Sequence, residues 1–419
     1  MSNMNITEYV RDLCFRAKEA SYGLAVTGTA ERNGALASIA GKLRENVSLI
    51  LEENEKDLAS AEVNGVPKTM LDRLRLTEAR INGIADAVLE VAALKDPTGE
   101  GSVTVRPNGL KITCQRVPLG VVGIIYEARP NVTVDAAALC IKSGNAVVLR
   151  GGKEAINTNR VLVKLMKEAF EGSAIQSDAL ALIDDVTREG TNALMNMRGL
   201  VDVLIPRGGK GLIKAVVENA KVPVIETGAG NCHVYVDERA DLEKALKVAV
   251  NAKCSRPSVC NAAETLLVHS AVAGEFIPKF YEATRDVSLE IRGCERTRAI
   301  LPEALSATEE DYDTEYNDYI IAVKVVDGLQ EAVEHIRKYT TGHSEAIITE
   351  SYTNARRFTS LIDAAAVYVN ASTRFTDGGE FGFGAEIGIS TQKLHTRGPM
   401  GLSHLTTVKY IVEGDGQVR

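Results

Sequence analysis

From residue 120 onward, short apolar runs alternate with longer runs of helical periodicity. The predicted strands cover residues 121–126, 146–149, 201–205 and 222–225, and the predicted helices cover residues 131–142, 154–170 and 211–219. This alternation predicts an α/β fold with a parallel sheet and helices on both faces. A second block, from residue 241 to about 370, has predicted strands at 265–268, 320–326 and 346–349. Ligands of such sheets bind beyond the carboxyl ends of the strands.

The two ends of the chain show other hydrophobic patterns than these alternating blocks. Residues 7–94 carry apolar side chains at three- and four-residue spacing, which predicts nearly continuous helix. Residues 103–106 and 111–117 flank a Pro-Asn-Gly turn, and their alternating pattern predicts a hairpin with one wet face. Residues 405–412 have strand texture again.

Composition excludes several classes of protein. At 419 residues the chain is too long for one simple core, so we expect two or three lobes. A net charge of −8 does not favour a nucleic-acid partner. No apolar run approaches the ~18 residues that span a bilayer, and the N-terminal residues lack a secretory signal pattern. We therefore expect a cytoplasmic protein without a membrane partner.

The cysteines and histidines argue against disulfides and metals. Seven cysteines form an odd number without a CxxC pair, which is typical of a reducing compartment. The six histidines include no HxxxH pair. The sequence predicts no structural or catalytic metal.

Two loops that follow predicted strands combine glycine with basic residues. The first is Arg150-Gly151-Gly152-Lys153, and the second contains Arg207-Gly208-Gly209. Glycine lets backbone N–H groups approach a phosphate, and the following helix offers its positive end. Either loop alone is often only a turn, but two in successive β-α units favour a dinucleotide. Neither matches a GxGxxG or Walker A sequence.

One cysteine lies among small, turn-forming residues. Cys260 belongs to the segment Ser-Arg-Pro-Ser-Val-Cys-Asn-Ala at 255–262, between a predicted helix (241–253) and a strand. Thiolate chemistry requires a partly exposed and electrostatically assisted sulfur, because a free thiol has a pKa near ~8.5. The alternative is a packed thiol, since free cysteine is among the most buried residue types.

Three further polar residues have two readings each. Asn131 is either the N-cap of a helix or an amide donor for an oxyanion. Glu226, at the end of a predicted strand, is either a general base or a solvated carboxylate, and the residues alone do not decide. His233 is either a packing residue or a catalytic one, and we expect it to serve packing.

Sequence motifs extend in order over nearly the whole chain. They are residues 123–133, 146–155, 205–209, 225–228, 255–269, 342–347 and 395–402. With these motifs the chain resembles the aldehyde dehydrogenase superfamily, and within it the family of gamma-glutamyl phosphate reductases. One departure is Thr340-Thr341 before Gly342, where the family pattern has glycine or serine at the first position.

The resemblance implies roles for particular residues. Cys260, and not Cys254, falls at the position of the nucleophile, and Asn131 falls at the position of the oxyanion asparagine. Glu226 matches the general-base glutamate of oxidising relatives, and Glu315 matches the glutamate that holds the nicotinamide ribose. Lys153 stands where NAD-using relatives carry glutamate, so a cation there implies NADP.

The remaining assignments also follow from the resemblance. Cofactor contacts are implied for Arg150, Lys153, Arg207, Gly208, Gly209 and Glu315. Substrate contacts are implied for Arg129, His343 and Arg397, and no metal is implied.

The implied fold has three parts. Residues 1–106 with 121–236 and roughly 375–394 form a cofactor-binding domain, and residues 237–374 form a catalytic domain that carries Cys260. Residues 107–120 with 395–419 form a β-ribbon that pairs with another subunit. A homo-oligomer, either a dimer or a tetramer, is therefore expected.

The implied activity is an oxidoreductase reaction of proline biosynthesis. NADPH reduces gamma-glutamyl phosphate to glutamate 5-semialdehyde through a thioester on Cys260, and phosphate is released. A separate glutamate kinase would supply this labile acyl phosphate. One alternative is an oxidising NAD(P)-dependent aldehyde dehydrogenase for another small aldehyde, which needs Glu226 to activate water. A non-enzymatic nucleotide-binding or scaffolding protein would not need Cys260.

Overall fold

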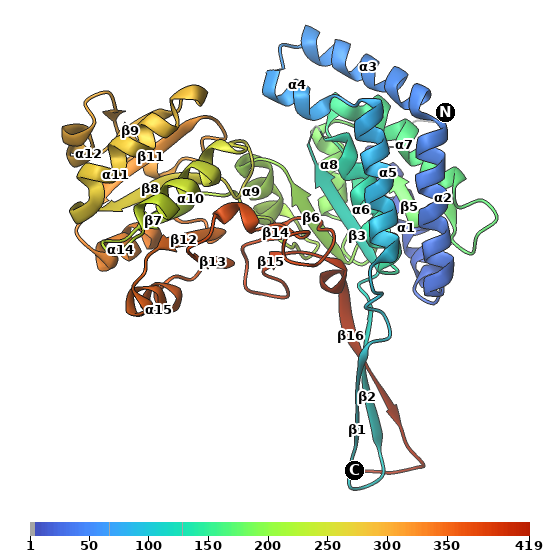
Figure 1. Ribbon diagram of the computed structural model, residues 1–419. Helices are drawn as coiled ribbons and strands as arrows, with labels where there is room; N and C mark the ends of the chain where they lie inside the picture. Colours follow the sequence, from blue (N-terminus) through green and yellow to red (C-terminus); the bar gives the residue numbers. More distant parts are fainter. Residues whose placement is uncertain (1–4, 67, 128) are drawn as a thin grey trace. The chain divides into compact units, whose positions relative to one another are not determined.

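The chain separates into two compact units. The computed structural model describes residues 5–66, 68–127 and 129–419 (Figure 1). Unit 1 runs to Glu226 and includes Gly382–Gly388 and Met400–Arg419. Unit 2 comprises Thr227–Phe381 and Ile389–Pro399.

The predicted domain limits differ from these units in several places. Residues 375–381, expected in the cofactor-binding part, and residues 395–399, expected in the β-ribbon, belong to unit 2. The predicted boundary after residue 236 falls inside unit 2, because β7 (Cys232–Val236) pairs within the large sheet of that unit. Residues 389–394, which we expected in the cofactor-binding part, belong to unit 2. There β14 (Ile389–Ser390) pairs with β15 (Gly398–Pro399), and Ser390 forms a bridge with Thr227.

Unit 1 is built on a four-stranded parallel sheet in the order β5-β4-β3-β6. Its strands are β3 (Val121–Tyr126), β4 (Ala146–Arg150), β5 (Leu180–Leu182) and β6 (Val203–Arg207). Its α-helices are α1 (Ile6–Leu24), α2 (Thr29–Glu45), α3 (Val47–Val63), α4 (Lys68–Leu74), α5 (Glu78–Ala93), α6 (Pro130–Lys142), α7 (Ile156–Glu168), α8 (Arg188–Met195) and α9 (Lys210–Asn219). Short 3₁₀ turns are η1 (Lys153–Ala155), η2 (Ser177–Ala179) and η5 (Leu402–Leu405).

Every residue of β3 is buried, so the apolar run that predicted this strand lies at the centre of the unit. The parallel pairing of β3, β4 and β6 confirms the expected α/β arrangement. It also brings the ends of β4 and β6, which precede the two glycine-basic loops, to the same edge of the sheet.

The nearly continuous helix predicted for residues 7–94 is confirmed as a run of five helices, α1 to α5, with Gly28, Asn46 and Thr77 at N-cap positions. One other predicted element of unit 1 is wrong. The strand predicted for residues 222–225 is only an isolated bridge between Val224 and Leu204. Pro223 has no N–H to donate, so a regular ladder cannot continue through it.

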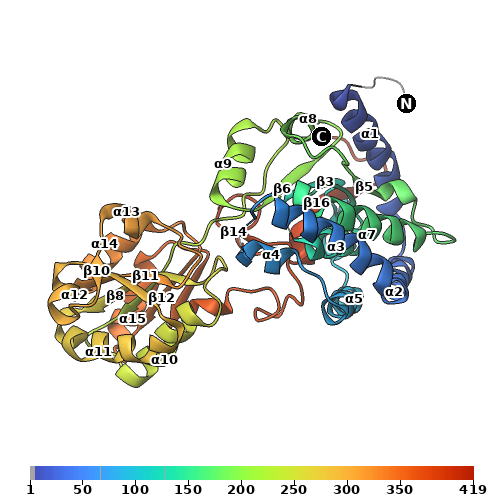
Figure 2. The same ribbon diagram turned by 90° about the horizontal axis from the view of Figure 1, so that it is seen from above.

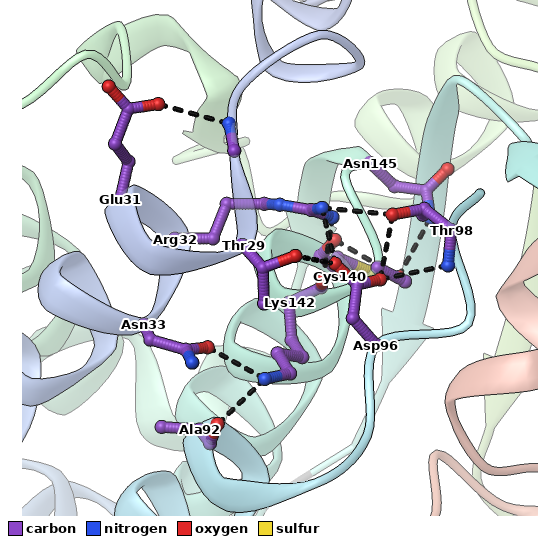
Figure 3. A network of polar contacts seen from close by, with 12 residues as sticks. Thr29, Glu31, Arg32, Asn33, Ala92, Asp96, Thr98, Cys140, Lys142 and Asn145 are labelled. Carbon is purple, nitrogen blue, oxygen red and sulfur yellow. Dashed lines mark hydrogen bonds and ion pairs between the residues drawn. The ribbon is translucent and has the colours of Figure 1, made fainter.

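A buried polar network joins α2 and α5 to α6 (Figure 3). The Arg32 guanidinium donates to Asp96 at 2.6 Å and to the carbonyl of Lys142 at 2.8 Å. The Lys142 ammonium in turn donates to Asn33 and to the carbonyl of Ala92, both at 2.6 Å. These charge-assisted bonds hold α2 and the end of α5 against the C-terminal end of α6, the helix that contains Asn131.

A separate antiparallel sheet extends from unit 1 in the order β1-β2-β16 (Figure 1). Its strands are β1 (Gly101–Val105), β2 (Lys111–Pro118) and β16 (Thr406–Glu413). The predicted hairpin and the predicted pairing of the C-terminal strand are confirmed. β1 was expected in the cofactor-binding part up to residue 106, but it pairs along its whole length with β2.

Unit 2 contains a seven-stranded parallel sheet in the order β10-β9-β11-β8-β7-β12-β13. Besides β7, its strands are β8 (Ala263–His269), β9 (Glu290–Gly293), β10 (Leu305–Ser306), β11 (Ile320–Val326), β12 (Ser344–Ile348) and β13 (Ala366–Val369). Its helices are α10 (Leu242–Cys254), α11 (Ser270–Ala283), α12 (Glu295–Ile300), α13 (Glu309–Asp313), α14 (Leu329–Tyr339) and α15 (Tyr352–Leu361), with 3₁₀ turns η3 (Arg285–Val287) and η4 (Thr373–Phe375).

The helices of unit 2 cover both faces of this sheet (Figure 2). Val234 and Val236 of β7 pack in one core with α10 and α11, whereas Tyr235 packs in a second core with α14 and α15. β7 was not predicted as a strand, yet it lies between β8 and β12.

Among the described residues, no helix is long and apolar enough to cross a membrane. The same part of the chain contains no cluster of three or more His, Cys, Asp or Glu side chains arranged to hold a metal ion.

Candidate active site

The loop between α10 and β8 presents Cys260. This residue is half-buried and in no disulfide, and it lies at a turn six residues beyond the end of α10. Cys254 is the last residue of α10 itself, and burial raises the pKa of its thiol. Cys260 therefore has the partial exposure that thiolate chemistry requires.

The chain segment that enters β7 holds the main chain of Cys260. The Cys232 thiol donates to the Cys260 carbonyl at an Sγ–O distance of 3.2 Å. Gly230 lies flat against the same peptide, because a Cβ on this residue would stand 1.4 Å from the Cys260 carbonyl oxygen. Only glycine fits there, so the residues before β7 act as a support for the loop.

Residues around η4 hold the other side of the loop. The Asn261 amide donates to the carbonyl of Thr376 at 3.0 Å, and the Thr373 hydroxyl donates to the Asn261 carbonyl at 2.7 Å. Arg374 adds bonds to the Asn261 side chain and, at 3.2 Å, to the Ser255 hydroxyl. The loop is thus fixed on two sides, which is the kind of support that a reacting side chain needs.

A buried ion pair joins the two elements that flank the loop. Lys253, near the end of α10, donates to Glu264 of β8 at 2.5 Å, and the two side chains are 0% and 1% exposed. Burial raises the pKa of Glu264 to about 7, whereas the charge of Lys253 acts in the opposite direction. Loss of either partner would leave an uncompensated charge in the interior.

Glu315 is positioned by the same support. Its Oε1 accepts the N–H of Gly230 at 2.9 Å, and the side chain is half-buried. The carboxylate predicted to hold ribose hydroxyls therefore also fixes the glycine that supports Cys260.

Two predicted substrate contacts lie elsewhere in unit 2. His343 precedes β12 and is fully buried, and burial lowers its pKa to about 4. Its Nδ1 lies 2.8 Å from the Ser344 hydroxyl and 3.8 Å from the Cys232 Sγ, so it backs the thiol that holds Cys260. Arg397 forms an ion pair with Asp363 at 2.8 Å. Their substrate roles remain predictions.

In unit 1, the two cations of the first glycine-basic loop, Arg150 and Lys153, have different surroundings. The Arg150 guanidinium donates to the carbonyls of Val186 and Thr187, both at 2.7 Å, and to Gly151 at 3.0 Å. It therefore holds loops together. Lys153 is exposed at the start of η1, just before α7, so its ammonium is the one presented to solvent.

The second glycine-basic loop binds a carboxylate of the same chain. The Glu127 carboxylate accepts the N–H of Gly209 at 3.0 Å, at the N-cap of α9. A Cβ on Gly208 would lie 2.6 Å from the Glu127 carboxyl carbon, so the absence of a side chain on Gly208 lets the carboxylate approach this closely. Arg207 donates to the carbonyl of Ile387. A carboxylate at this helix start shows that the loop accommodates negative charge, as a phosphate would require.

Asn131 is not a helix cap. α6 begins at Pro130, its N-cap is the half-buried Arg129, and Asn131 is its second residue. The Asn131 amide donates to Asp135 at 2.9 Å, and burial raises the pKa of Asp135 to about 6. The N-cap interpretation is therefore wrong, while the oxyanion role of Asn131 stays a prediction. Glu226 is half-buried at the end of unit 1.

The sequence analysis missed the residues that support the loop, namely Gly230, Cys232, Lys253, Glu264 and Arg374. One signal was available for the ion pair. Glu264 interrupts an otherwise apolar strand and Lys253 ends an apolar helix face, so a paired buried charge was the consistent explanation.

Comparison with known proteins supports the same family. The model of the aldehyde dehydrogenase family matches residues 7–297. The gamma-glutamyl phosphate reductase of Carboxydothermus hydrogenoformans is 61% identical over 411 residues, covering 98% of this chain and 99% of that protein. The protein of the same name from Clostridium acetobutylicum is 55% identical and covers 99% of this chain and 100% of the relative.

Solved structures show the same fold. The crystal structure of gamma-glutamyl phosphate reductase from Thermotoga maritima has a TM-score of 0.95 at 51% identity, covering 98% of this chain and 99% of that one. An acetylating aldehyde dehydrogenase from Geobacillus thermoglucosidasius, with a TM-score of 0.70 at 20% identity, covers 99% of this chain and 98% of its own and shares the fold alone. The chain therefore belongs to the aldehyde dehydrogenase family, in the branch whose members carry the name gamma-glutamyl phosphate reductase.

Proposed function

We propose that this protein reduces gamma-glutamyl phosphate to glutamate 5-semialdehyde with NADPH and releases phosphate. The names of its relatives, at up to 61% identity, support this substrate. The structural observation that carries the proposal is the supported loop, which presents the half-buried Cys260 thiol between two ordered elements.

Cys260 would act as the nucleophile. Its thiolate attacks the acyl carbon, the C–S bond of a thioester forms, and the C–O bond to phosphate breaks. Phosphate departs with the electron pair of that bond and needs no strong acid to assist it. The Asn131 amide and the main-chain N–H of Cys260 are the proposed donors to the oxyanion.

The donor set of unit 1 fits a nicotinamide dinucleotide. The Gly209 N–H at the start of α9 binds the Glu127 carboxylate, and a phosphate of the cofactor would take the place of this carboxylate. The exposed Lys153 provides a cation suited to the 2′-phosphate of NADP. Arg150 and Arg207 would support these loops. Glu315, a residue of unit 2, would hold the nicotinamide ribose. When bound, the reduced cofactor supplies the hydride that converts the thioester to the aldehyde.

Glu226 would have a muted role in this direction. An activated water would hydrolyse the thioester and waste the intermediate, so a strong general base beside Cys260 is undesirable. An oxidising aldehyde dehydrogenase would instead need Glu226 for this purpose.

The biological setting forms part of the proposal. An acyl phosphate is labile in water, so a separate glutamate kinase would supply it. All seven cysteines are free thiols, which is consistent with the reducing cytoplasm. The exposed three-stranded sheet would join copies of the chain into a homo-oligomer.

The decisive experiment is a single-turnover assay with gamma-glutamyl phosphate generated in situ by a glutamate kinase. We expect NADPH oxidation by the native protein and by Cys254→Ala, and none above trace by Cys260→Ala. Mass spectrometry should find the acyl group on the Cys260 peptide. NADP reduction by aldehyde without any need for phosphate would instead identify an oxidising aldehyde dehydrogenase.

A further inference from the structure

Two arginines of unit 2 surround the nucleophile loop. Arg374 of η4 donates through Nε to the Ser255 hydroxyl at 3.2 Å and through Nη1 to the Asn261 side chain. Its guanidinium thus spans the two ends of the loop that carries Cys260. Both partners are neutral, so they orient the cation without cancelling its charge.

The second arginine lies on the loop itself. Arg256 is exposed and close enough to Arg374 for the two cations to repel each other. Burial, followed by this repulsion, lowers the pKa of Arg374, whereas the negative charges of Cys260 and Asp377 act in the opposite direction. Within the described part of the chain, neither arginine forms an ion pair with a carboxylate.

The other charged groups around the loop are already engaged. Glu264 is paired with Lys253, and Glu315 accepts the N–H of Gly230. Burial and the charge of Glu345 raise the pKa of Cys232, which stays a neutral thiol. Arg256 and Arg374 therefore form no ion pair with a described carboxylate, although the charges of Cys260 and Asp377 act on Arg374. An anion that joined the two cations would relieve their mutual repulsion.

We propose that Arg256 and Arg374 form an anion site beside Cys260, which holds the phosphate group of the acyl phosphate and the inorganic phosphate that leaves it. This inference rests on the proposed function. The Cys260 thiolate attacks the acyl carbon, and a single bridging oxygen separates this carbon from the phosphorus. The phosphate group must therefore lie close to the Cys260 sulfur. Planar guanidinium groups suit phosphate oxygens because they donate two hydrogen bonds in a fixed geometry.

A binding experiment tests the site without turnover. Iodoacetamide is a neutral reagent, and the rate at which it alkylates Cys260 is followed by mass spectrometry of the Cys260 peptide. We expect inorganic phosphate to slow this rate in the native protein, whereas sodium chloride of equal ionic strength does not. In Arg374→Gln and in Arg256→Gln, half-protection should require about tenfold more phosphate, because each substitution removes a charged hydrogen-bond donor.

Arg357→Gln is the matched control. It removes the same charge from an exposed position on α15 and should leave the phosphate midpoint unchanged. Arg374→Gln also removes the contacts that tie Ser255 to Asn261, so a changed loop alone could alter its reactivity. Arg256→Gln avoids this problem because that side chain forms no hydrogen bond in the described structure.

Steady-state kinetics in the oxidative direction identify the anion. A phosphate site predicts that the KM for phosphate rises about tenfold in Arg256→Gln while the KM for the aldehyde is unchanged. A rise in the KM for the aldehyde alone would assign the pair to the substrate carboxylate and overturn the proposal. The proposal is equally overturned if phosphate gives no protection in the native protein, a result that leaves the role of Cys260 to its own assay.

Discussion

At the scale of single residues, the structure separates cations and amides that look equivalent in the sequence. Arg150 and Lys153 lie in one loop. The Arg150 guanidinium donates hydrogen bonds to backbone carbonyls, whereas the Lys153 ammonium is exposed. Arg129, and not Asn131, is the N-cap of α6, and the Asn131 amide donates a hydrogen bond to Asp135. These local contacts decide which substitutions should change chemistry and which should change stability.

Lys153→Glu should shift cofactor preference from NADPH towards NADH. A carboxylate repels a 2′-phosphate and accepts hydrogen bonds from ribose hydroxyls. The kcat/KM for NADPH divided by the kcat/KM for NADH should therefore fall by about tenfold or more. Lys164→Glu makes the same charge change on α7 away from its start and should leave the ratio alone. Equal ratios in the native protein and Lys153→Glu would contradict the assignment.

Asn131→Ala should lower turnover far more than it weakens cofactor binding. Loss of one oxyanion donor reduces the rate by roughly a hundredfold. Because Asn131 does not cap α6, the melting temperature should change little. Normal turnover together with a clear drop in melting temperature would show that the contact with Asp135 is structural only.

At the scale of secondary-structure elements, the Lys253–Glu264 pair connects the end of α10 to β8. Both side chains are fully buried, so the energetic role of the pair differs from that of a surface ion pair. The pair fixes the two ends between which the Cys260 loop must close.

Lys253→Met should destabilise unit 2 by about 3–5 kcal/mol, because Glu264 would remain as a buried, unpaired carboxylate. The double variant Lys253→Met/Glu264→Leu should recover most of this loss. Denaturant unfolding followed by circular dichroism measures both. Lys279→Met removes an exposed partner of Glu275 on α11 and should change stability by less than about 1 kcal/mol. Equal stabilities of Lys253→Met and Lys279→Met would refute the role of the pair.

At the scale of the whole molecule, the sheet β1-β2-β16 carries apolar side chains that the chain itself leaves exposed. Val105 is 67% exposed on β1, and Tyr410 and Val412 are 66% and 56% exposed on β16. β1 and β16 are also the two edges of the sheet. A narrow sheet with exposed apolar residues and open edges is suited to pairing with a second copy of the chain.

Deletion of residues 407–419 should dissociate the assembly while unit 1 stays folded. Truncation there removes β16 but keeps Leu405, which is fully buried in the core of unit 1. Light scattering at micromolar concentration measures the mass. Residues 415–419 lie beyond β16, so their deletion serves as the control. A full-length monomer, or a truncated chain that keeps the native mass, would leave the oligomer proposal unsupported.

Much of the architecture follows from local sequence. β3, β4, β6, β8 and β11 lie where apolar runs predicted strands, because a buried parallel strand must be apolar on both faces. The loop that carries Cys260 was also predictable, since small and turn-forming residues separate a periodic helix from an apolar strand. The assignment of Cys260 over Cys254 came from the family resemblance. Both thiols are half-buried, but Cys254 lies at the end of α10 whereas Cys260 lies on the loop.

Long-range contacts decided the rest. β7 was missed because its five residues follow a glycine-rich segment, and only pairing with β8 and β12 makes them a strand. Gly230 and Cys232 support Cys260 from 28 or more residues away, and Arg374 reaches Ser255 across 119 residues of chain. Such contacts depend on which strands become neighbours, and local patterns of hydrophobicity and turn residues do not encode that choice.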